Sequence, residues 1–548
     1  MSHPLPPHAP LMIRLGLLFA LVAALIWLAW HQLGRPVPLP AVPGHAQKLN
    51  CLSYAPFRGG QAPYMRPLRL PDDQIKEDLK HLSKVTSCIR TYSATGPESK
   101  VTRIASELGF KVLQGIWLNR NLAENRREIE AALRLVRQHP GTIAALIVGN
   151  ETLLRGELGP ERIKVYLEEV RRRANLLVTY ADVWEFWLKA PELAPAVDFI
   201  TIHVLPYWED RPVRAGEAVG HVRAVREKVA KTFPGKEILI GEVGWPSEGR
   251  MRAGALPSPA NQARVLGGVV AAAKEEGWKV NLIEAFDQPW KRILEGTVGG
   301  SWGVFDGKTR APKFRFGDPV SNHPRWRLSA MLGIGAAFFI FAAASLAGRR
   351  KEVDWTTGLA VAGIALSSGL VFGAAALGLP MEPPVLGDRL RSAAMLVLSL
   401  IVPVLAAAAV VRAEPLAGLT VALNPSLWRR ERRAGVLLSC LFAAVLVAAM
   451  HVALGLVFDP RYKDFQLLLL TGPVAAFAIL VAARNGGALR PDLAERVAAT
   501  ILIGSALFVV WNEGVANRQA LFFGTLLVIL ALTALRTSRG PATAPAPG

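Results

Sequence analysis

The chain has 548 residues, a formal net charge of +20 and a mean hydropathy of +0.29. It is long enough for more than one domain, and its three cysteines, Cys51, Cys88 and Cys440, are too few for a disulfide framework. The positive charge does not indicate a nucleic-acid partner, because about half of it lies outside residues 48–320, in tails and loops where membrane proteins carry Lys and Arg.

The N-terminal region combines an apolar block with a Pro-rich stretch. We assign residues 1–10 to a cytoplasmic tail, 11–33 to a transmembrane helix and 34–47 to a linker. A spanning helix needs about 20 mostly apolar residues, and the block at 11–30 satisfies this. A cleaved signal peptide is the alternative, although no clear A-x-A site follows the block.

Residues 48–320 alternate short β-rich runs with helical-period stretches such as 72–87 and 121–138. We predict eight strands at 48–55, 88–92, 111–118, 143–150, 176–183, 197–205, 237–243 and 280–287. Eight strand–helix units in this length predict an α/β fold, a closed (β/α)8 TIM barrel. An open doubly wound sheet is the alternative, but no Gly-rich phosphate loop follows the first strand. Cys51 and Cys88 fall on the first two strands; we expect free thiols, although a pair is conceivable in an oxidising compartment.

A short linker at 321–327 precedes a membrane domain at 328–536 and a cytoplasmic tail at 537–548. The domain has about seven apolar helices, at 328–347, 355–379, 392–411, 434–457, 465–483, 497–511 and 520–535. The block at 497–511 is short, and a re-entrant segment is its alternative. Alternate loops are rich in basic residues, which places them in the cytoplasm and residues 45–325 on the outer face. Their basic residues are Arg349, Arg350, Lys351, Arg412, Arg429, Arg430, Arg432, Arg433, Arg484, Arg490 and Arg496.

Polar and aromatic residues gather at the carboxyl ends of the predicted strands, where barrel enzymes hold their active sites. Glu151 ends the run IAALIVGNE, and Glu242 ends the run ILIGE three strands later. An ionised Glu is rarely buried without a partner, so packing alone explains neither residue well. Two carboxylates about 5–5.5 Å apart can protonate a leaving oxygen and attack an anomeric carbon in a retaining glycosidase. The alternative is that each Glu pairs with a neighbouring Arg or Lys.

The segments VGNE, GEVGWPSEG and IEAFDQPWK resemble glycoside hydrolase family 17, whose members are barrels acting on β-1,3-glucans. The resemblance covers about 48–316 and implies that Glu151 is the general acid/base and Glu242 the nucleophile. It also implies that Asn150 binds the sugar 2-hydroxyl and that Arg90 braces the nucleophile. The remaining residues that we expect to contact substrate are Tyr54, Tyr92, Tyr207, Trp245, Glu284, Asp287, Trp290, Lys291 and Trp302.

The sequence departs from the family at Gln288, where relatives often have Glu, so no acidic role is expected there. His203 lies within a predicted strand, and we expect a hydrogen-bonded core residue rather than a catalytic group. Trp and Tyr residues such as Trp208 could equally be core or rim positions. No His, Cys and Asp residues have metal-ligand spacing, so we expect no metal and no cofactor.

A glycosyl-enzyme intermediate on Glu242 could pass to water or to a sugar hydroxyl. The membrane anchor favours a transglycosylase that remodels an envelope or periplasmic glucan at a bacterial inner membrane, as in similar membrane-bound members of the family. An endo-β-1,3-glucanase, an accessory subunit of a glucan synthase and a non-catalytic scaffold are the alternatives. The expected partners are β-glucan, the lipid bilayer and a glucan synthase. The short cytoplasmic loops leave no room for a nucleotide-sugar domain.

Overall fold

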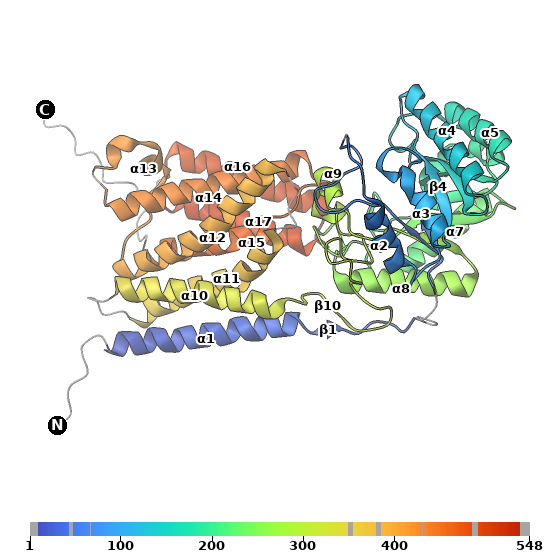
Figure 1. Cartoon of the computed structure of the whole chain (residues 1–548). Helices are drawn as coiled ribbons and strands as arrows, with labels where there is room; N and C mark the ends of the chain where they lie inside the picture. Colours follow the sequence, from blue (N-terminus) through green and yellow to red (C-terminus); the bar gives the residue numbers. More distant parts are fainter. Residues whose placement is uncertain are drawn as a thin grey trace. The chain divides into compact units, whose positions relative to one another are not determined.

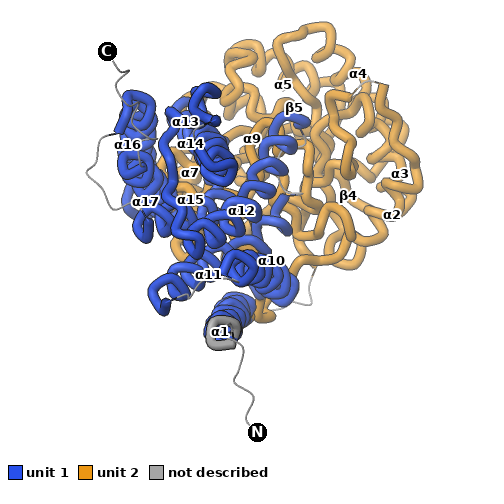
Figure 2. Tube along the Cα trace, turned by 90° about the vertical axis from the view of Figure 1, so that its left-hand side faces the viewer, with its two compact units in different colours: residues 1–35, 321–548 blue, residues 36–320 orange. Residues whose placement is uncertain are grey.

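The computed structural model describes residues 9–42, 48–65, 67–348, 354–379, 385–429, 431–484 and 491–537. Most of the predicted tails, the linker residues 43–47 and the basic residues Arg349, Arg350, Lys351, Arg430 and Arg490 lie outside this part of the chain. The chain divides into two compact units, Pro36–Val320 and Met1–Arg35 with Ser321–Gly548, which Figure 2 colours separately.

The unit Pro36–Val320 contains a closed barrel of eight parallel strands. Figure 1 labels one of them, β4, among the helices of this unit. The strands are β2 (Cys51–Ser53), β3 (Cys88–Arg90), β4 (Lys111–Ile116), β5 (Ile143–Asn150), β6 (Leu177–Val183), β7 (Ile200–His203), β8 (Ile238–Val243) and β9 (Lys279–Leu282). Each pairs with the next, and β2 pairs with β9 to close the ring. The predicted barrel is confirmed, and the open sheet was the wrong alternative. A further short pair, β1 (Pro36–Val37) with β10 (Val320–Ser321), joins the two ends of this unit.

Helices follow the barrel strands and pack against them. They are α2 (Asp72–Leu82), η1 (Gly96–Lys100), α3 (Val101–Glu107), α4 (Leu122–Gln138), α5 (Pro160–Ala174), α6 (Trp184–Lys189), η2 (Pro191–Ala196), α7 (Ala218–Thr232), α8 (Pro259–Glu276), η3 (Pro289–Lys291) and α9 (Arg292–Gly299). Local residues explain where several begin. The Asn121 side chain accepts hydrogen bonds from the Ala123 and Glu124 amides of α4. The Ser258 side chain accepts one from the Asn261 amide of α8, which has a proline at its first position.

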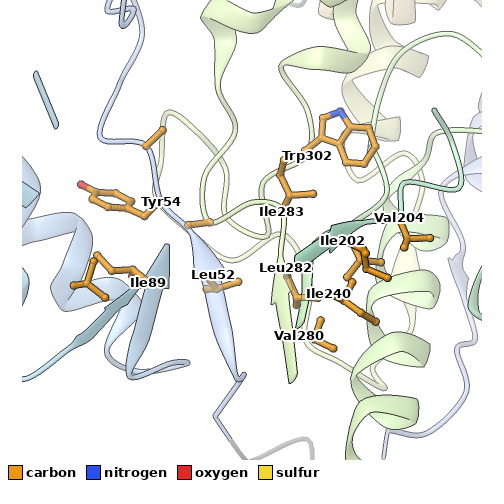
Figure 3. Close-up of a cluster of buried hydrophobic side chains, with 14 of the residues drawn as sticks. Leu52, Tyr54, Ile89, Ile202, Val204, Ile240, Val280, Leu282, Ile283 and Trp302 are labelled. Atoms are coloured by element: carbon orange, nitrogen blue, oxygen red, sulfur yellow. The ribbon is translucent and has the colours of Figure 1, made fainter. Parts of the chain in front are cut away.

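Buried aliphatic side chains on neighbouring strands form the core of the barrel unit. Figure 3 shows Leu52 of β2, Leu282 of β9, Ile240 of β8 and Ile202 of β7, which are at most 2% exposed. Their burial stabilises the ring of strands by removing apolar surface from water. The ring in turn holds the carboxyl ends of all eight strands together, and the polar residues at those ends form the candidate site.

Cys51 and Cys88 form a disulfide bond, so the expectation of free thiols was wrong. Strand β2 lies beside β3 with Leu52 opposite Ile89, which brings the preceding residues, Cys51 and Cys88, to a Cα–Cα distance of 4.5 Å. That distance suits a disulfide. The register between two strands 37 residues apart could not be read from the sequence.

The second unit is helical. Its helices are α1 (Ala9–Leu33), α10 (Trp326–Ala347), α11 (Trp355–Gly378), α12 (Leu386–Arg412), α13 (Leu419–Leu423), η5 (Pro425–Leu427), α14 (Arg433–Phe458), α15 (Leu467–Arg484), α16 (Leu493–Glu513) and α17 (Arg518–Leu535). Among the described residues, eight helices are long and apolar enough to cross a membrane. The block at 497–511, which we expected to be short, lies within α16, a helix of 21 residues.

Small residues allow α10 and α11 to pack closely. A Cβ atom on Gly333 would lie 2.0 Å from the carbonyl oxygen of Gly369, and one on Gly373 would lie 2.0 Å from that of Ser329. Larger side chains would therefore push the two helices apart. Close backbone approach at Gly and Ser is common where apolar helices associate without a hydrophobic driving force.

Candidate active site

Glu242 and Glu151 both lie at the carboxyl end of the barrel strands. Glu242 is the penultimate residue of β8 and is 4% exposed. Glu151 directly follows β5, and its amide donates to the carbonyl of Ala181 on β6 at 2.8 Å. The backbone of Glu151 has φ +50°, a left-handed conformation that is uncommon for a residue with a side chain. Such a conformation at a strand end is typical of functional positions that surrounding structure holds in place.

His203, the last residue of β7, joins the two glutamates. Its Nδ1 lies 2.8 Å from Oε1 of Glu151, and its Nε2 lies 3.7 Å from Oε1 of Glu242. One carboxylate oxygen of each glutamate lies within 4.8 Å of the other. The imidazole is fully buried, as expected for a hydrogen-bonded core histidine. Its place between both carboxylates was not foreseen, because strands β5, β7 and β8 meet only when the barrel closes.

The Arg90 guanidinium, at the end of β3, is the centre of the polar network. It is 1% exposed and donates to the Gly241 carbonyl at 2.6 Å, to Oδ1 of Asn150 at 2.5 Å and to Oε1 of Glu242 at 3.1 Å. Both of its terminal nitrogens also lie 3.3 Å from Nε2 of His203. Arg cannot accept a hydrogen bond, so Nε2 must be the acceptor. In a neutral His203 the proton is then on Nδ1, which donates to Glu151.

Tyr92 adds a second donor to Glu242. Its hydroxyl lies 2.9 Å from Oε1 of Glu242 and 2.9 Å from Oγ of Ser53. Asn281 donates to the same Ser53 oxygen at 2.7 Å. Sequence reasoning missed both Ser53 and Asn281 as members of this hydrogen-bond network. Burial, followed by the nearby Glu242 carboxylate, raises the pKa of Tyr92, so the phenol stays protonated and able to donate. Both Arg90 and Tyr92 thus bind Oε1 and leave Oε2 of Glu242 for chemistry.

Two opposing effects determine the pKa of Glu151. Burial raises it, but the hydrogen bond from His203 and the charges of Arg155 and Arg90 outweigh burial and hold the pKa below its usual value. Oε1 of Glu151 is occupied by His203, so a proton on this carboxyl would sit on Oε2. That oxygen is the one that could exchange a proton with a substrate.

A turn after β5 holds Glu151 from the other side. Asp182, at the end of β6, accepts hydrogen bonds from the Tyr180 hydroxyl and, at 3.1 Å, from the Leu153 amide. Burial raises the pKa of Asp182 to about 6. The side chains of Tyr180 and Asp182 anchor the turn 151–154 and thereby fix the position of Glu151.

Glu284, which follows strand β9, is buried and forms an ion pair with the partly buried Lys291. Lys291 Nζ lies 2.9 and 3.0 Å from the two carboxylate oxygens of Glu284, which is 1% exposed. Burial raises the pKa of Glu284 to about 7 despite the neighbouring ammonium. Burial lowers the pKa of Lys291, but Glu284 and Glu295 outweigh it and leave the value raised. Sequence reasoning missed Glu295 of α9. Burial, together with the charges of Glu151 and Glu242, raises the pKa of this carboxyl.

Several expected sugar contacts are instead enclosed by protein. The Tyr54 hydroxyl donates to the buried Asp78, the Tyr207 hydroxyl to the Arg250 carbonyl, and the Trp245 indole to the Leu256 carbonyl. All three aromatic side chains are 0% exposed. Their polar groups already have protein partners, and their ring faces are covered. They support the loops around the site rather than lining it.

The other residues expected to contact substrate differ in their burial and in their hydrogen-bond partners. Asp287 accepts from the Gly303 amide and from Lys313, which ties two loops together. Trp302 is 3% exposed and packs edge-to-face with Tyr207, whereas Trp290 is half-buried beside Tyr64. Gln288, the departure from the family pattern, is fully buried and donates to the Ala55 carbonyl. Trp290 and Tyr92 are therefore the predicted aromatic contacts that keep some exposed surface.

Glu151, His203 and Glu242 are also close enough to share a metal ion, judged over the described part of the chain. A cation there would displace the hydrogen bond from His203 to Glu151 and would face the Arg90 guanidinium at Nε2 of His203. Because Arg stays positively charged, it disfavours a second cation at this place. The donor set fits two carboxylates oriented by an imidazole better than a metal centre.

Residues 51–303 match the family model of the BtgE/BtgC glycoside hydrolase domain. The chain is 27% identical over 288 residues to a glucan 1,3-beta-glucosidase of Arthroderma benhamiae, a match that covers 47% of this chain and 91% of the relative. It is 25% identical over 300 residues to glucan endo-1,3-beta-glucosidase btgC of Emericella nidulans, covering 49% of this chain and 46% of the relative.

Among solved structures, the chain is similar to a glycoside hydrolase family 17 beta-1,3-glucanosyltransferase from Rhizomucor miehei. The identity is 24%, the TM-score is 0.43, and the match covers 49% of this chain and 96% of that one. The two curated relatives are fungal and do not support the expected bacterial source. The segment with all eight barrel strands, Glu151 and Glu242 is nevertheless similar in sequence to a glycoside hydrolase domain.

Proposed function

We propose that residues 48–320 form a retaining enzyme that acts on β-1,3-glucan, with Glu242 as nucleophile and Glu151 as general acid/base. The observation that carries the proposal is the closeness of the two carboxylates, since one oxygen of Glu151 lies within 4.8 Å of one oxygen of Glu242. Retaining glycosidases hold the pair about 5–5.5 Å apart, whereas inverting enzymes need about 6.5–9.5 Å to admit a water molecule. The substrate class is suggested by the relatives, whose names describe β-1,3-glucan enzymes.

The first step breaks the glycosidic bond. Oε2 of Glu242 attacks the anomeric carbon while Oε2 of Glu151 gives its proton to the leaving oxygen, and the bonding electrons depart with that oxygen. Arg90 and Tyr92 donate to Oε1 of Glu242, which holds the nucleophile in place. Asn150, oriented by Arg90, is then available to the sugar 2-hydroxyl.

The second step releases the sugar from Glu242. Glu151, now ionised, takes a proton from an acceptor hydroxyl, whose oxygen attacks the anomeric carbon and displaces the Glu242 carboxylate. We propose that the acceptor is another glucan chain, which makes the enzyme a transglycosylase. Endo-hydrolysis, in which water is the acceptor, is the second candidate, because the same carboxylates perform both reactions.

We further propose that the helical unit spans a membrane and that the barrel unit lies on its outer, oxidising side. Support comes from the eight apolar helices and from the Cys51–Cys88 disulfide, since disulfides persist mainly outside the cytoplasm. Protease added to intact spheroplasts, from which any outer membrane or cell wall has been removed, should then digest the barrel unit. Digestion that requires lysed spheroplasts would contradict this orientation. A bacterial inner membrane and a glucan synthase partner stay predictions.

Product analysis tests the reaction. The full chain in detergent should convert a laminari-oligosaccharide of one defined length into both longer and shorter products. Only shorter products would favour hydrolysis, and equal behaviour of the wild type and Glu242→Gln would contradict any enzymatic role for the pair.

Rescue by azide distinguishes the nucleophile from the general acid/base. In Glu242→Ala, azide should replace the nucleophile and yield the α-glycosyl azide from an aryl β-glucoside donor. In Glu151→Ala, azide should replace the acceptor and yield the β-glycosyl azide. Exchanged stereochemistry between the two variants would reverse the assignment.

A further inference from the structure

The short segment 92–95 between β3 and η1 is held by side chains rather than by other backbone groups. The amides of Tyr92 and Ser93 donate to Oε2 of Glu98 at 3.1 and 3.2 Å. The amide of Ala94 donates to Oε2 of Glu128 at 2.9 Å. The amide of Thr95 donates to Oγ of Ser93 at 3.1 Å. Four consecutive amides therefore point at side-chain oxygens, and three of them at two carboxylates.

Glu128, on α4, binds the same segment through the hydroxyls of Ser93 and Thr95. Its Oε1 accepts from the Ser93 hydroxyl at 2.6 Å and from the Thr95 hydroxyl. Its Oε2 also accepts from the Trp117 amide at 3.3 Å, on the loop that follows β4. Four donors thus converge on one carboxylate, and they join two neighbouring loops at the carboxyl end of the barrel.

Both carboxylates are buried, since Glu98 is 7% and Glu128 5% exposed. Neither forms an ion pair within the described residues, so amides and hydroxyls are what stabilise them. Burying a carboxyl without a cation is costly unless its oxygens are hydrogen-bonded. Burial, with a smaller contribution from Glu128, raises the pKa of Glu98 to about 7. Because both amides bind Oε2, a proton can occupy Oε1 of Glu98 without breaking either bond.

Segment 92–95 begins with the residue whose hydroxyl contacts the nucleophile. The Tyr92 hydroxyl lies 2.9 Å from Oε1 of Glu242, and the Tyr92 amide is bound by Glu98. A shift of about 1 Å in such a group can cost about 10²-fold in rate. Glu98 and Glu128 touch neither Glu151 nor Glu242 through any hydrogen bond of the described chain.

We propose that Glu98 and Glu128 are positioning residues that hold the backbone of residues 92–95 so that the Tyr92 hydroxyl stays on the nucleophile Glu242. This inference rests on the proposed function. Glu98 acts through Tyr92, so its contribution to the rate exists only when the Tyr92 hydroxyl is present. A residue that merely stabilised the fold would lack this dependence.

A double-mutant cycle in the full chain tests the dependence on Tyr92. Glu98→Ala should lower kcat by about 10- to 100-fold with KM changed by about twofold or less, because the lost interaction orients the nucleophile rather than the substrate. In a Tyr92→Phe background the same substitution should have little further effect. Glu98→Gln, whose amide oxygen can accept both backbone bonds, should restore kcat to within about threefold of wild type.

Glu130→Ala is the matched control, because Glu130 lies on the same helix as Glu128 and forms a solvent-exposed ion pair with Arg173. Glu130→Ala should leave kcat unchanged.

If Glu98→Ala does not fold, Ser93→Ala takes its place in the cycle. The Ser93 substitution removes one donor to Glu128 and the acceptor of the Thr95 amide. An inactive wild type would overturn the proposed function. An active wild type whose Glu98→Ala loss is absent, or is undiminished in the Tyr92→Phe background, would overturn the positioning role alone.

Discussion

Buried polar groups are arranged differently in the barrel unit and in the helical unit. In the barrel unit, Arg90 contacts Asn150, His203 and Glu242, and these four residues come from four different strands. In the helical unit, several buried hydroxyls bond to carbonyls of their own helix, as Ser399 does to Leu396 and Thr533 to Ile529. Local bonds of this kind satisfy a polar group without linking distant elements.

The difference indicates where chemistry can occur. A buried network of charges is costly to assemble, and such networks cluster at functional sites. The helical unit has one comparable group among its described residues, the buried Glu495, which accepts from the Leu419 amide at a helix end. The barrel unit should therefore carry the activity, and the helical unit should act as its support. The four predictions that follow test this division.

The largest effect is expected at the nucleophile. Glu242→Gln should lower kcat on the order of 10⁴-fold, as loss of a catalytic nucleophile does in other enzymes. Glu237→Gln, which removes a surface partner of Lys279 just before the same strand, is the matched control and should be close to wild type. Rates measured with an aryl β-glucoside donor would decide; comparable losses in both variants would contradict a specific role for Glu242.

Arg90→Lys should lower kcat by about 10²- to 10³-fold, the usual cost of losing one aligned donor to a reacting group. A lysine ammonium keeps the charge but cannot reach Gly241, Asn150 and Glu242 together as the guanidinium does. Arg103→Lys, in a surface pair with Asp72 and Glu107, should change kcat little. Near-normal turnover by Arg90→Lys would mean that charge alone, without the shared geometry, supports the nucleophile.

His203→Ala should move the basic limb of the kcat/KM profile upward by about one pH unit. The imidazole hydrogen bond is the main opposition to burial at Glu151, so its removal raises the pKa of that carboxyl. A general acid with a raised pKa keeps its proton to higher pH, which extends activity in that direction. A basic limb that stays in place or moves down would contradict the assignment of Glu151 as the acid.

The smallest effect on activity is expected from the helical unit. Gly333→Val should destabilise the packing of α10 against α11 by about 1–3 kcal/mol, because its side chain would overlap the Gly369 carbonyl. Gly335→Val on the same helix meets nothing within 4 Å and is the control. Melting of the full chain in detergent should separate the two variants, while turnover of soluble oligosaccharides stays within about twofold of wild type. A matching loss of turnover in Gly333→Val would show that the barrel depends on the helical unit.

Features that repeat along the chain were predictable. Alternating apolar and polar residues predicted eight strand–helix units, and long uninterrupted apolar blocks predicted the eight long helices. The placement of Glu151 and Glu242 at strand ends also followed, because each ends a β-rich run and parallel strands end on the same side of a barrel. These patterns involve residues close in sequence, so neighbouring side chains carry the information.

Contacts between strands far apart in sequence depended on the closed barrel. The Cys51–Cys88 disulfide requires the register of β2 and β3, and the placement of His203 between Glu151 and Glu242 requires three strands at the correct stagger. Likewise, Tyr54, Tyr207 and Trp245 have the composition of sugar platforms but are covered by protein. Sequence by itself determined which residue types stand at the ends of the strands, whereas the tertiary structure decided which of them meet, because register and closure depend on packing across the whole domain.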